Sequence, residues 1–321
     1  MGVKGKMSST LKTISKINEH QNKKNLILSI LILTRNRKVE LARALRSCIE
    51  CSLPAQIEFV IVDNASEDGT KEEVDRFFRA NPFDYRYIYL PVNIGAAAGR
   101  NEGLKGVQGR YVYFIDDDAY IDGPKQLFFE EMINYLQNHE DVFGITTTIY
   151  DTEIQGNRSV LKIKGGTLEH CTKVLWFHCG SVLVDRQRGF DQEMLFLKHI
   201  FKGMPELYPS LRSYFNGKYI VEMDNMRVIH QPSSHTRPSK NAEAIFHYTG
   251  GLHAKLIFYP LLVYPVLYLM FCLRIIKHLG FRGLPEAFNK LLRLNKYLVR
   301  ETVPLSKFIH IVKDFGFIAV F

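Results

Sequence analysis

Four short apolar runs alternate with segments of helical periodicity in the N-terminal part of the chain, and this alternation narrows the available folds more than any other feature. The runs are rich in β-branched and aromatic residues and short enough to be buried strands, at 25–33, 57–62, 85–90 and 111–115. Strands that alternate with helices connect by right-handed crossovers and pair in parallel. The pattern therefore predicts an α/β fold with a mostly parallel central sheet flanked by helices.

Polar side chains follow three of these runs at the point where each predicted strand ends. Thr34 and Arg35 follow the first run, Asp63 follows the second, and three adjacent carboxylates at 116–118 follow the fourth. The carboxyl ends of parallel strands meet at one edge of a sheet, which is the usual ligand side. Adjacent carboxylates repel one another, so a divalent cation with a nucleotide would account for them, because carboxylate oxygens suit Mg²⁺ or Mn²⁺. A solvated acidic turn is the alternative.

The chain has a formal net charge of +9, and such an excess favours an anionic partner. Lysines dominate residues 1–24, which carry no apolar core of signal-peptide length, so we interpret them as a flexible basic arm. The basic residues gather in the two tails and are not interleaved with aromatic residues on one face, which argues against nucleic-acid binding. The five scattered cysteines, an odd number, indicate reduced thiols in the cytoplasm.

Four motifs follow one another along the first part of the chain and read ILTRNR, VIVDNASEDGT, NIGAAAGRNEGL and FIDDDAYI. Together they resemble the motifs of the family 2 nucleotide-sugar glycosyltransferases, in particular their bacterial rhamnosyltransferase-like branch. The resemblance is strong over 25–122 and weaker to about Ser234. It implies a glycosyltransferase A-type fold, a Mn²⁺ or Mg²⁺ cofactor and sugar transfer with inversion. We accordingly divide the chain into a nucleotide-binding half, 25–122, and an acceptor-binding half of the same domain, 123–240.

Five residues outside the carboxylate cluster are predicted to bind the donor nucleotide. The loop with Thr34 and Arg35 can present backbone groups to the base, and the guanidinium can balance phosphate charge. Asp63 can accept the imide N–H of uracil or thymine, as the resemblance implies, or it can cap the following helix. Asn93 and Arg100 belong to a loop of small residues that leads into a helix, where the backbone can approach a pyrophosphate closely.

The three adjacent carboxylates have separate roles in the family pattern. The resemblance implies that Asp116 contacts the ribose and that Asp118 binds the metal, with Asp117 as an outer or alternate ligand. A metal there would bridge the two phosphates and stabilise the leaving nucleoside diphosphate as a Lewis acid. His230 follows the predicted strand 226–229 and matches a position where relatives often place a histidine near the metal or the diphosphate. The alternative is a histidine without a ligand role.

Inverting transfer needs a base that takes the proton of the acceptor hydroxyl during its attack on the anomeric carbon. Relatives carry this acid just before a helix, after a Gly-Phe-Asp motif, which stands here at 189–191. The resemblance therefore implies Glu206 as the base and Asp191 as the second candidate, although a single acid stands where relatives usually have two. The alternative for Glu206 is an acid stabilised by a helix N-terminus. The resemblance also implies that Trp176 and His178 lie near the acceptor.

The last part of the chain, 241–321, is predicted to be helical and to associate with a membrane. Residues 256–273 are apolar and uncharged over 18 positions, the lower limit for a transmembrane helix, and Pro260 and Pro265 are expected to kink it. A monotopic or re-entrant segment, a spanning helix and a buried helical pair all stay open. The segment 284–300 is amphipathic and basic, as in helices that lie on an anionic membrane or pack on their own domain.

These observations predict an inverting, metal-dependent glycosyltransferase that moves a sugar from a UDP- or dTDP-linked donor to a glycan or lipid-linked acceptor. We expect a peripheral or monotopic protein on the cytoplasmic face of the cell membrane that acts in cell-envelope polysaccharide synthesis; a homo-oligomer stays open. Two alternatives remain. One is a nucleotidyltransferase that makes a nucleotide sugar, and the other is a nucleotide-binding scaffold without catalysis.

Overall fold

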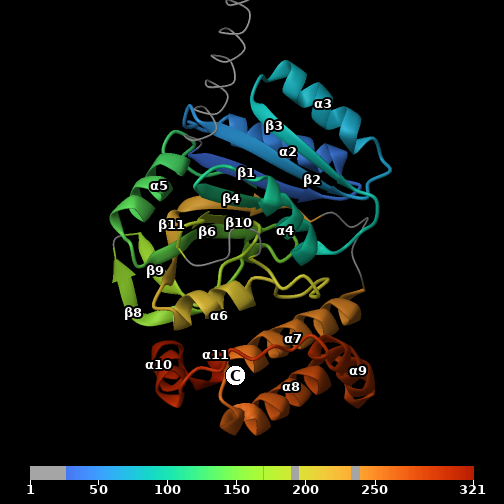
Figure 1. Cartoon of the computed structure of the whole chain (residues 1–321), viewed down its shortest axis with the longest axis vertical. Helices are drawn as coiled ribbons and strands as arrows, with labels where there is room; N and C mark the ends of the chain where they lie inside the picture. The colour runs from blue at the N-terminus through green and yellow to red at the C-terminus, as the bar shows by residue number, and fades with distance from the viewer. Residues whose placement is uncertain (1–26, 169, 189–194, 233–238) are drawn as a thin grey trace, which may run out of the picture.

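The computed structural model describes residues 27–168, 170–188, 195–232 and 239–321. The predicted basic arm and the candidate base Asp191 lie outside these ranges. A central sheet carries helices on its faces, and the helices that follow the last strand form a separate group at one end of the molecule (Figure 1).

The first half of the sheet has the predicted alternation of strands and helices. Its elements are β1 (Leu28–Thr34), α2 (Lys38–Ile49), β2 (Ile57–Asn64), α3 (Thr70–Ala80), β3 (Asp84–Leu90), α4 (Ala96–Gly106) and β4 (Tyr111–Asp116). Strand β1 pairs in parallel with both β2 and β4, and β2 pairs in parallel with β3. The carboxyl ends of all four strands therefore lie at one edge of the sheet, as predicted.

The second half makes the sheet mixed. Its elements are β5 (Ala119–Ile121), α5 (Phe128–Asn138), β6 (Val142–Asp151), β7 (Gly156–Asn157), β8 (Lys162–Leu168), β9 (Cys171–Val174), β10 (Ser181–Asp185), α6 (Leu207–Phe215) and β11 (Tyr219–His230). In the described part of the chain the strand order is β3-β2-β1-β4-β10-β6-β11-β9-β8. Strand β10 runs antiparallel between β4 and β6, and β11 runs parallel to β6. The strand predicted at 226–229 is part of the longer strand β11, which has an irregular register between Met223 and Arg227.

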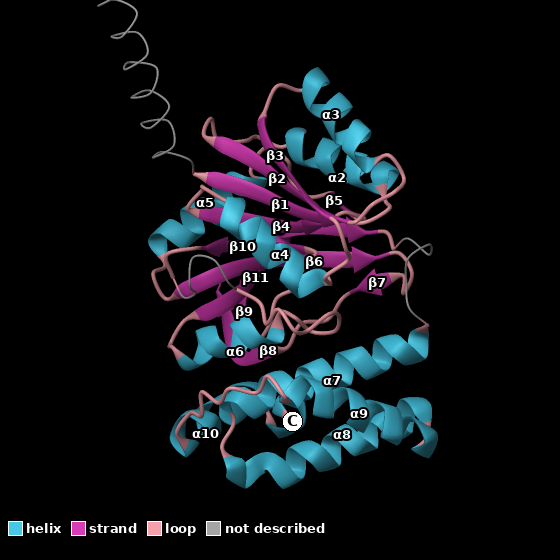
Figure 2. Ribbon diagram, turned by 45° about the vertical axis from the view of Figure 1, so that its right-hand side comes forward, coloured by secondary structure: helices cyan, strands magenta, loops and turns pink. Residues whose placement is uncertain are grey.

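The alternation of side chains along β1 divides the core between the two faces of the sheet. Ile30 and Ile32 pack with α2, α3 and α5, whereas Leu31 packs with α4 on the opposite face (Figure 2). Successive strand residues point to opposite faces, so an uninterrupted apolar run fills both layers at once. This arrangement fixes α4, and the residues at its N-terminus, against β1.

The C-terminal helices share one apolar cluster with α6. They are α7 (Lys240–Phe258), η1 (Leu261–Val263), α8 (Tyr264–Leu279), η2 (Phe281–Gly283), α9 (Leu284–Asn295), α10 (Leu305–Phe315) and α11 (Phe317–Val320). Helix α7 packs against α6, α8 and α9, and so lies between the sheet unit and the remaining helices (Figures 1 and 2).

The apolar run at 256–273 is not one helix. Helix α7 ends at Phe258, and Tyr259 is extended because the residue before a proline disfavours helical geometry. Pro265 lies in the first turn of α8, where proline is tolerated and causes no kink. Together η1 and α8 form a helix, Leu261–Leu279, that is long and apolar enough to cross a membrane by length and composition. One such helix is weak evidence for a span, and 22% of an apolar stretch of 18 residues within it is buried in the protein.

The close contact between α4 and the sheet can be tested at Gly103. A Cβ at this position would lie 2.8 Å from both Leu31 Cδ1 and Val62 Cγ2. Gly103→Val is therefore expected to lower the free energy of unfolding in urea by about 1–3 kcal/mol through overpacking. Lys105→Val places the same side chain at an exposed position of α4 and should cost less than about 0.7 kcal/mol. Equal losses in the two variants would contradict this packing.

Candidate functional site

A cavity of about 520 Å³ lies at the carboxyl ends of β1 and β4. It brings together most of the residues predicted to bind the nucleotide and the metal. The predicted residues that line it are Thr34, Arg35, Asn93, Arg100, Asp116, Asp117, Asp118 and His230. Parallel pairing accounts for this convergence, since it delivers residues far apart in sequence to the same edge of the sheet.

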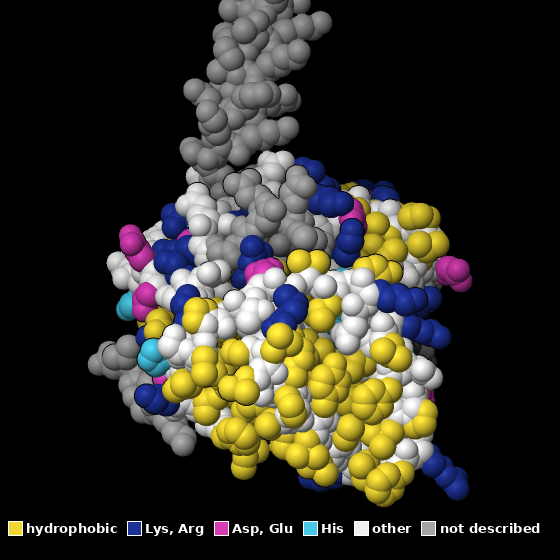
Figure 3. Space-filling view, turned by 60° about the horizontal axis from the view of Figure 1, so that its bottom comes forward, with side chains coloured by type: hydrophobic (Ala, Val, Ile, Leu, Met, Phe, Trp, Pro, Cys, Tyr) yellow, Lys and Arg dark blue, Asp and Glu magenta, His cyan; other side chains and the backbone are white. Residues whose placement is uncertain are grey.

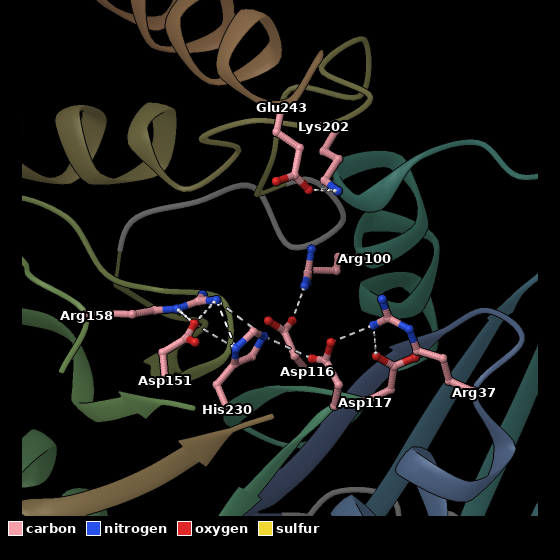
Figure 4. Close-up of polar contacts among 10 residues, drawn as sticks. Arg37, Arg100, Asp116, Asp117, Asp151, Arg158, Lys202, His230 and Glu243 are labelled. Carbon is pink, nitrogen blue, oxygen red and sulfur yellow. Dashed lines mark hydrogen bonds and ion pairs between the residues drawn. The ribbon is translucent and has the colours of Figure 1, made fainter. Parts of the chain in front are cut away.

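Two arginines compensate the charge of the three adjacent carboxylates (Figure 4). Arg37 Nη1 lies 2.8 Å from both Asp117 Oδ1 and Asp118 Oδ2, and Arg100 Nη2 lies 2.6 Å from Asp116 Oδ1. Burial raises the pKa of the Asp117 carboxyl above its ordinary value, although Arg37 acts in the opposite direction. The cluster is therefore a largely buried network of ion pairs and not a solvated acidic turn.

His230, the last residue of β11, joins this cluster with its ring held between two carboxylates. Its Nε2 lies 3.1 Å from Asp118 Oδ1, and its Nδ1 lies 3.0 Å from Asp151 Oδ2. Arg158 Nη2 lies 2.8 Å from Asp151 Oδ2 and so helps to fix this carboxylate. A histidine that ligates a metal commonly has its other ring nitrogen bonded to a carboxylate, which sets the orientation of the ring.

The donor set fits a divalent cation. Asp116, Asp118 and His230 each offer one ligand atom, and these atoms lie within 4.8 Å of one another. Two carboxylate oxygens with one imidazole nitrogen suit Mn²⁺, and the carboxylates alone suit Mg²⁺.

Asp63 lies apart from this cavity. It lines a separate hollow of about 730 Å³ with Tyr87 and Tyr89. Its Oδ1 accepts a hydrogen bond of 2.7 Å from the main-chain nitrogen of Ser66, and its Oδ2 accepts one from the hydroxyl of Tyr87. Both oxygens therefore have partners in the protein, and contact with a base would require the Tyr87 bond to give way. The base-binding role of Asp63 stays a prediction.

Glu206 is positioned by a loop that α4 holds in place. The side chain of Asn101 in α4 accepts from the main-chain nitrogens of Leu195 and Phe196 and donates to the Phe196 carbonyl at 2.7 Å. The Phe201 carbonyl accepts a hydrogen bond of 3.0 Å from the nitrogen of Ala96. The loop from 195 to 206 is thus tied to the same helix that carries Arg100.

The predicted acceptor residues share a second cavity, of about 330 Å³, with Glu206. Glu206 directly precedes α6 and makes no side-chain capping hydrogen bond to it, and Trp176 and His178 line the same cavity. Burial raises the pKa of the Glu206 carboxyl to about 7, with nearby Asp116 adding to the rise and Arg100 opposing it. Burial lowers the pKa of His178 to about 4, so its ring is neutral at pH 7.

Comparison with known proteins identifies the family. Residues 29–190 match the model of the family described as glycosyl transferase family 2. This chain belongs to glycosyl transferase family 2. An uncharacterized glycosyltransferase of Haemophilus influenzae is 29% identical over 164 residues, which is 50% of this chain and 63% of that protein. TuaG of Bacillus subtilis, provisionally named as a teichuronic acid biosynthesis glycosyltransferase, is 26% identical over 172 residues, or 52% of this chain and 66% of TuaG. Both matches span less than two thirds of the relative.

The fold of this family 2 member is also found in solved structures. The crystal structure of GalNAc-T7 with UDP, GalNAc and Mn²⁺ superposes with a TM-score of 0.61 at 12% identity, over 84% of this chain and 54% of that one. This likeness is one of fold, and it confirms the predicted glycosyltransferase A-type α/β architecture.

Several site residues of this family 2 member escaped the sequence analysis. Arg37 lies within the ILTRNR motif, so its position at a strand end could have indicated a role. Arg158 and Asp151 carry no local signal, because they contact His230 only through the fold. Lys202 and Glu243 also line the first cavity, and their ion pair of 2.9 Å joins the loop to α7 (Figure 4).

The metal site can be tested by thermal unfolding. Mn²⁺ at a hundred times its Kd is expected to stabilise the wild-type fold by about 2.7 kcal/mol. Asp118→Asn removes one of the three candidate ligands and should abolish most of the rise in Tm. Asp122→Asn is the matched control, because the carboxylate of Asp122 pairs with Arg227 outside the cluster, and it should keep the full rise. A rise of the same size in both variants would exclude Asp118 as a ligand.

Proposed function

We propose that this chain is an inverting, metal-dependent glycosyltransferase that uses a UDP- or dTDP-linked sugar. The observation that carries the proposal is the buried cluster of Asp116, Asp118 and His230 at the same cavity as Arg100, with Glu206 beside it. GalNAc-T7 offers support, since its crystal structure holds UDP and Mn²⁺ in a related fold.

On the donor side the chain supplies positive charge where a diphosphate would lie. Arg100 and the N-terminus of α4 both face the first cavity, and a helix N-terminus favours anions. Gly95 precedes α4 with a φ of +88° and lies against Phe201, so only glycine fits there. Asp116, Asp118 and His230 would hold the cation. When bound, the cation would supply Lewis-acid stabilisation of the leaving diphosphate.

On the acceptor side Glu206 acts as the general base. Its oxygen takes the proton of the acceptor hydroxyl, and the hydroxyl oxygen forms a bond to the anomeric carbon on the face opposite the diphosphate. The bond between that carbon and the phosphate oxygen breaks, and the nucleoside diphosphate leaves with the electron pair. A carboxyl with a pKa of about 7 suits this role, because a base works best when its pKa is near the working pH. Asp191 stays the second candidate.

Glu206→Gln tests the base. Since the amide cannot take a proton, transfer is expected to fall by about 10²–10⁴-fold while the affinity for UDP stays unchanged. In the wild type, transfer should fall as the pH drops through about 7, because the Glu206 carboxylate becomes protonated. Glu130→Gln, at an exposed position of α5, should leave the rate and its pH profile unchanged. A Glu206→Gln variant with full activity would remove Glu206 from the mechanism.

Product analysis separates the proposed activity from its alternatives. A glycosyltransferase releases a nucleoside diphosphate, whereas a nucleotidyltransferase that makes a nucleotide sugar releases pyrophosphate. A scaffold would bind the nucleotide and release neither product.

An apolar face on the C-terminal helices supports membrane association. We define this face by its exposed side chains, which are Leu261, Leu262, Leu269, Leu273, Phe281, Leu292, Phe317 and Ile318. Figure 3 displays a continuous apolar surface at this end of the molecule, with basic side chains around it. Exposed basic residues within or next to the same helices include Lys277, Arg282, Arg293 and Lys296. Apolar area with surrounding positive charge suits the surface of an anionic lipid bilayer. We propose that the apolar face lies flat on the cytoplasmic side of the membrane.

Vesicle sedimentation tests this orientation. Phosphatidylglycerol vesicles should bind the wild type, and binding should weaken in high salt, which screens the basic residues. The double variant Leu262→Asp, Phe281→Asp removes two exposed apolar side chains, each worth about 1.5–3 kcal/mol on burial, so binding should fall at least tenfold. Val39→Asp changes a side chain that is 72% exposed on the sheet unit and should have no effect. Unchanged binding in the double variant would exclude this face.

A further inference from the structure

The second cavity connects the predicted base with the C-terminal helices. One wall carries Glu206 and Trp176, and the other is built from α7, α8 and α11. On α8 the cavity is lined by Leu267 and Phe271, which are almost fully buried, and by Arg274. Its volume of about 330 Å³ lies at the lower end of the range for small-molecule sites.

Two cations face each other in this cavity. Lys255 Nζ and Arg274 Nη1 both donate to the main-chain oxygen of Phe321, at 3.0 and 2.8 Å. In the described ranges neither side chain pairs with an aspartate or a glutamate. The shared oxygen supplies at most one negative charge against two positive ones. Burial lowers the pKa of Lys255 to about 7, and the neighbouring Arg274 adds to this shift.

The cavity and the apolar face lie on opposite sides of one helix. Leu267 and Phe271 point from α8 into the cavity, whereas Leu269 and Leu273 of the same helix are exposed on the apolar face. A helix with its side chains is about 10 Å thick. A molecule in the cavity would therefore lie about one helix away from the lipid surface proposed above.

We propose that this cavity binds the acceptor as an anionic amphiphile, a lipid phosphate that carries the acceptor sugar. The phosphate lies between Lys255 and Arg274, the first part of the lipid chain contacts Leu267 and Phe271, and the sugar hydroxyl reaches Glu206. The inference rests on the proposed function for the role of Glu206, whereas the binding of the phosphate rests on the two cations alone.

Tryptophan fluorescence gives a direct test, because Trp176 is the only tryptophan of the chain and lines this cavity. The probes are farnesyl phosphate, farnesol and inorganic phosphate, titrated into the full chain. Farnesyl phosphate should change the fluorescence saturably at a concentration at least tenfold below that needed for either other probe. Farnesol binding as tightly as farnesyl phosphate, or inorganic phosphate doing so, would overturn the proposal.

Substitutions of Lys255 and Arg274 test whether these two side chains contact the phosphate. Lys255→Gln and Arg274→Gln should each weaken the affinity for farnesyl phosphate at least tenfold. Lys255→Arg should keep the affinity within about threefold of the wild-type value, since it keeps the charge. Arg46→Gln, at an exposed position of α2, is the control and should bind as the wild type does. If Lys255→Gln does not fold, Arg274→Gln decides, and wild-type affinity in that variant would overturn the proposal.

UDP titrations on the same proteins separate this inference from the proposed function. Lys255→Gln and Arg274→Gln should bind UDP normally and lose only the binding of farnesyl phosphate. Farnesyl phosphate binding in a wild type that fails to bind UDP would contradict the proposed function and leave the cavity assignment intact. Normal UDP binding without a farnesyl phosphate response in the wild type would overturn the assignment of the cavity and leave the proposed function intact.

Discussion

Repulsion among Asp116, Asp117 and Asp118 is the constraint on which the site depends. Carboxylates this close cannot all stay ionised in a buried turn unless positive charge lies within a few ångströms. Arg37, from the loop after β1, and Arg100, from α4, supply that charge. Both arginines reach the cluster only because β1 and β4 pair in parallel and α4 lies close on β1. The packing of β1, β4 and α4 therefore also sets the charge compensation of the site.

The proposed acceptor side depends on the same elements for its position. The loop before α6 is held by Asn101 and Ala96 of α4, so the proposed base Glu206 and the proposed donor-binding residue Arg100 are positioned by the same helix. His247 of α7 lines both cavities, and α7 itself packs on α6. The C-terminal helices thus complete the walls of both cavities. The same helices carry the surface that we assign to the membrane and line the cavity that we assign to the acceptor.

Burial tunes the titration of this region in two directions. It raises the pKa of Glu206 to about 7 and lowers that of His178 to about 4, because both shifts favour the neutral form of a desolvated group. Near neutral pH, Glu206 is thus the one of these two groups that exchanges a proton. Asp63 differs again, since the Ser66 nitrogen and the Tyr87 hydroxyl bond to its two oxygens. Its predicted contact with a base requires the Tyr87 bond to give way.

The sequence by itself determined the local elements and the edge of the sheet where the chemistry lies. The apolar runs specify β1 to β4, and the polar residues that end them, from Thr34 to Asp118, follow at the carboxyl ends whatever the rest of the chain does. Only the tertiary structure decided the insertion of antiparallel β10 and the contacts of Arg158 and Asp151 with His230. The reason is physical. Strand and helix periodicity depends on residues that are close in sequence, whereas charge compensation and cavity walls arise between groups that only folding brings together.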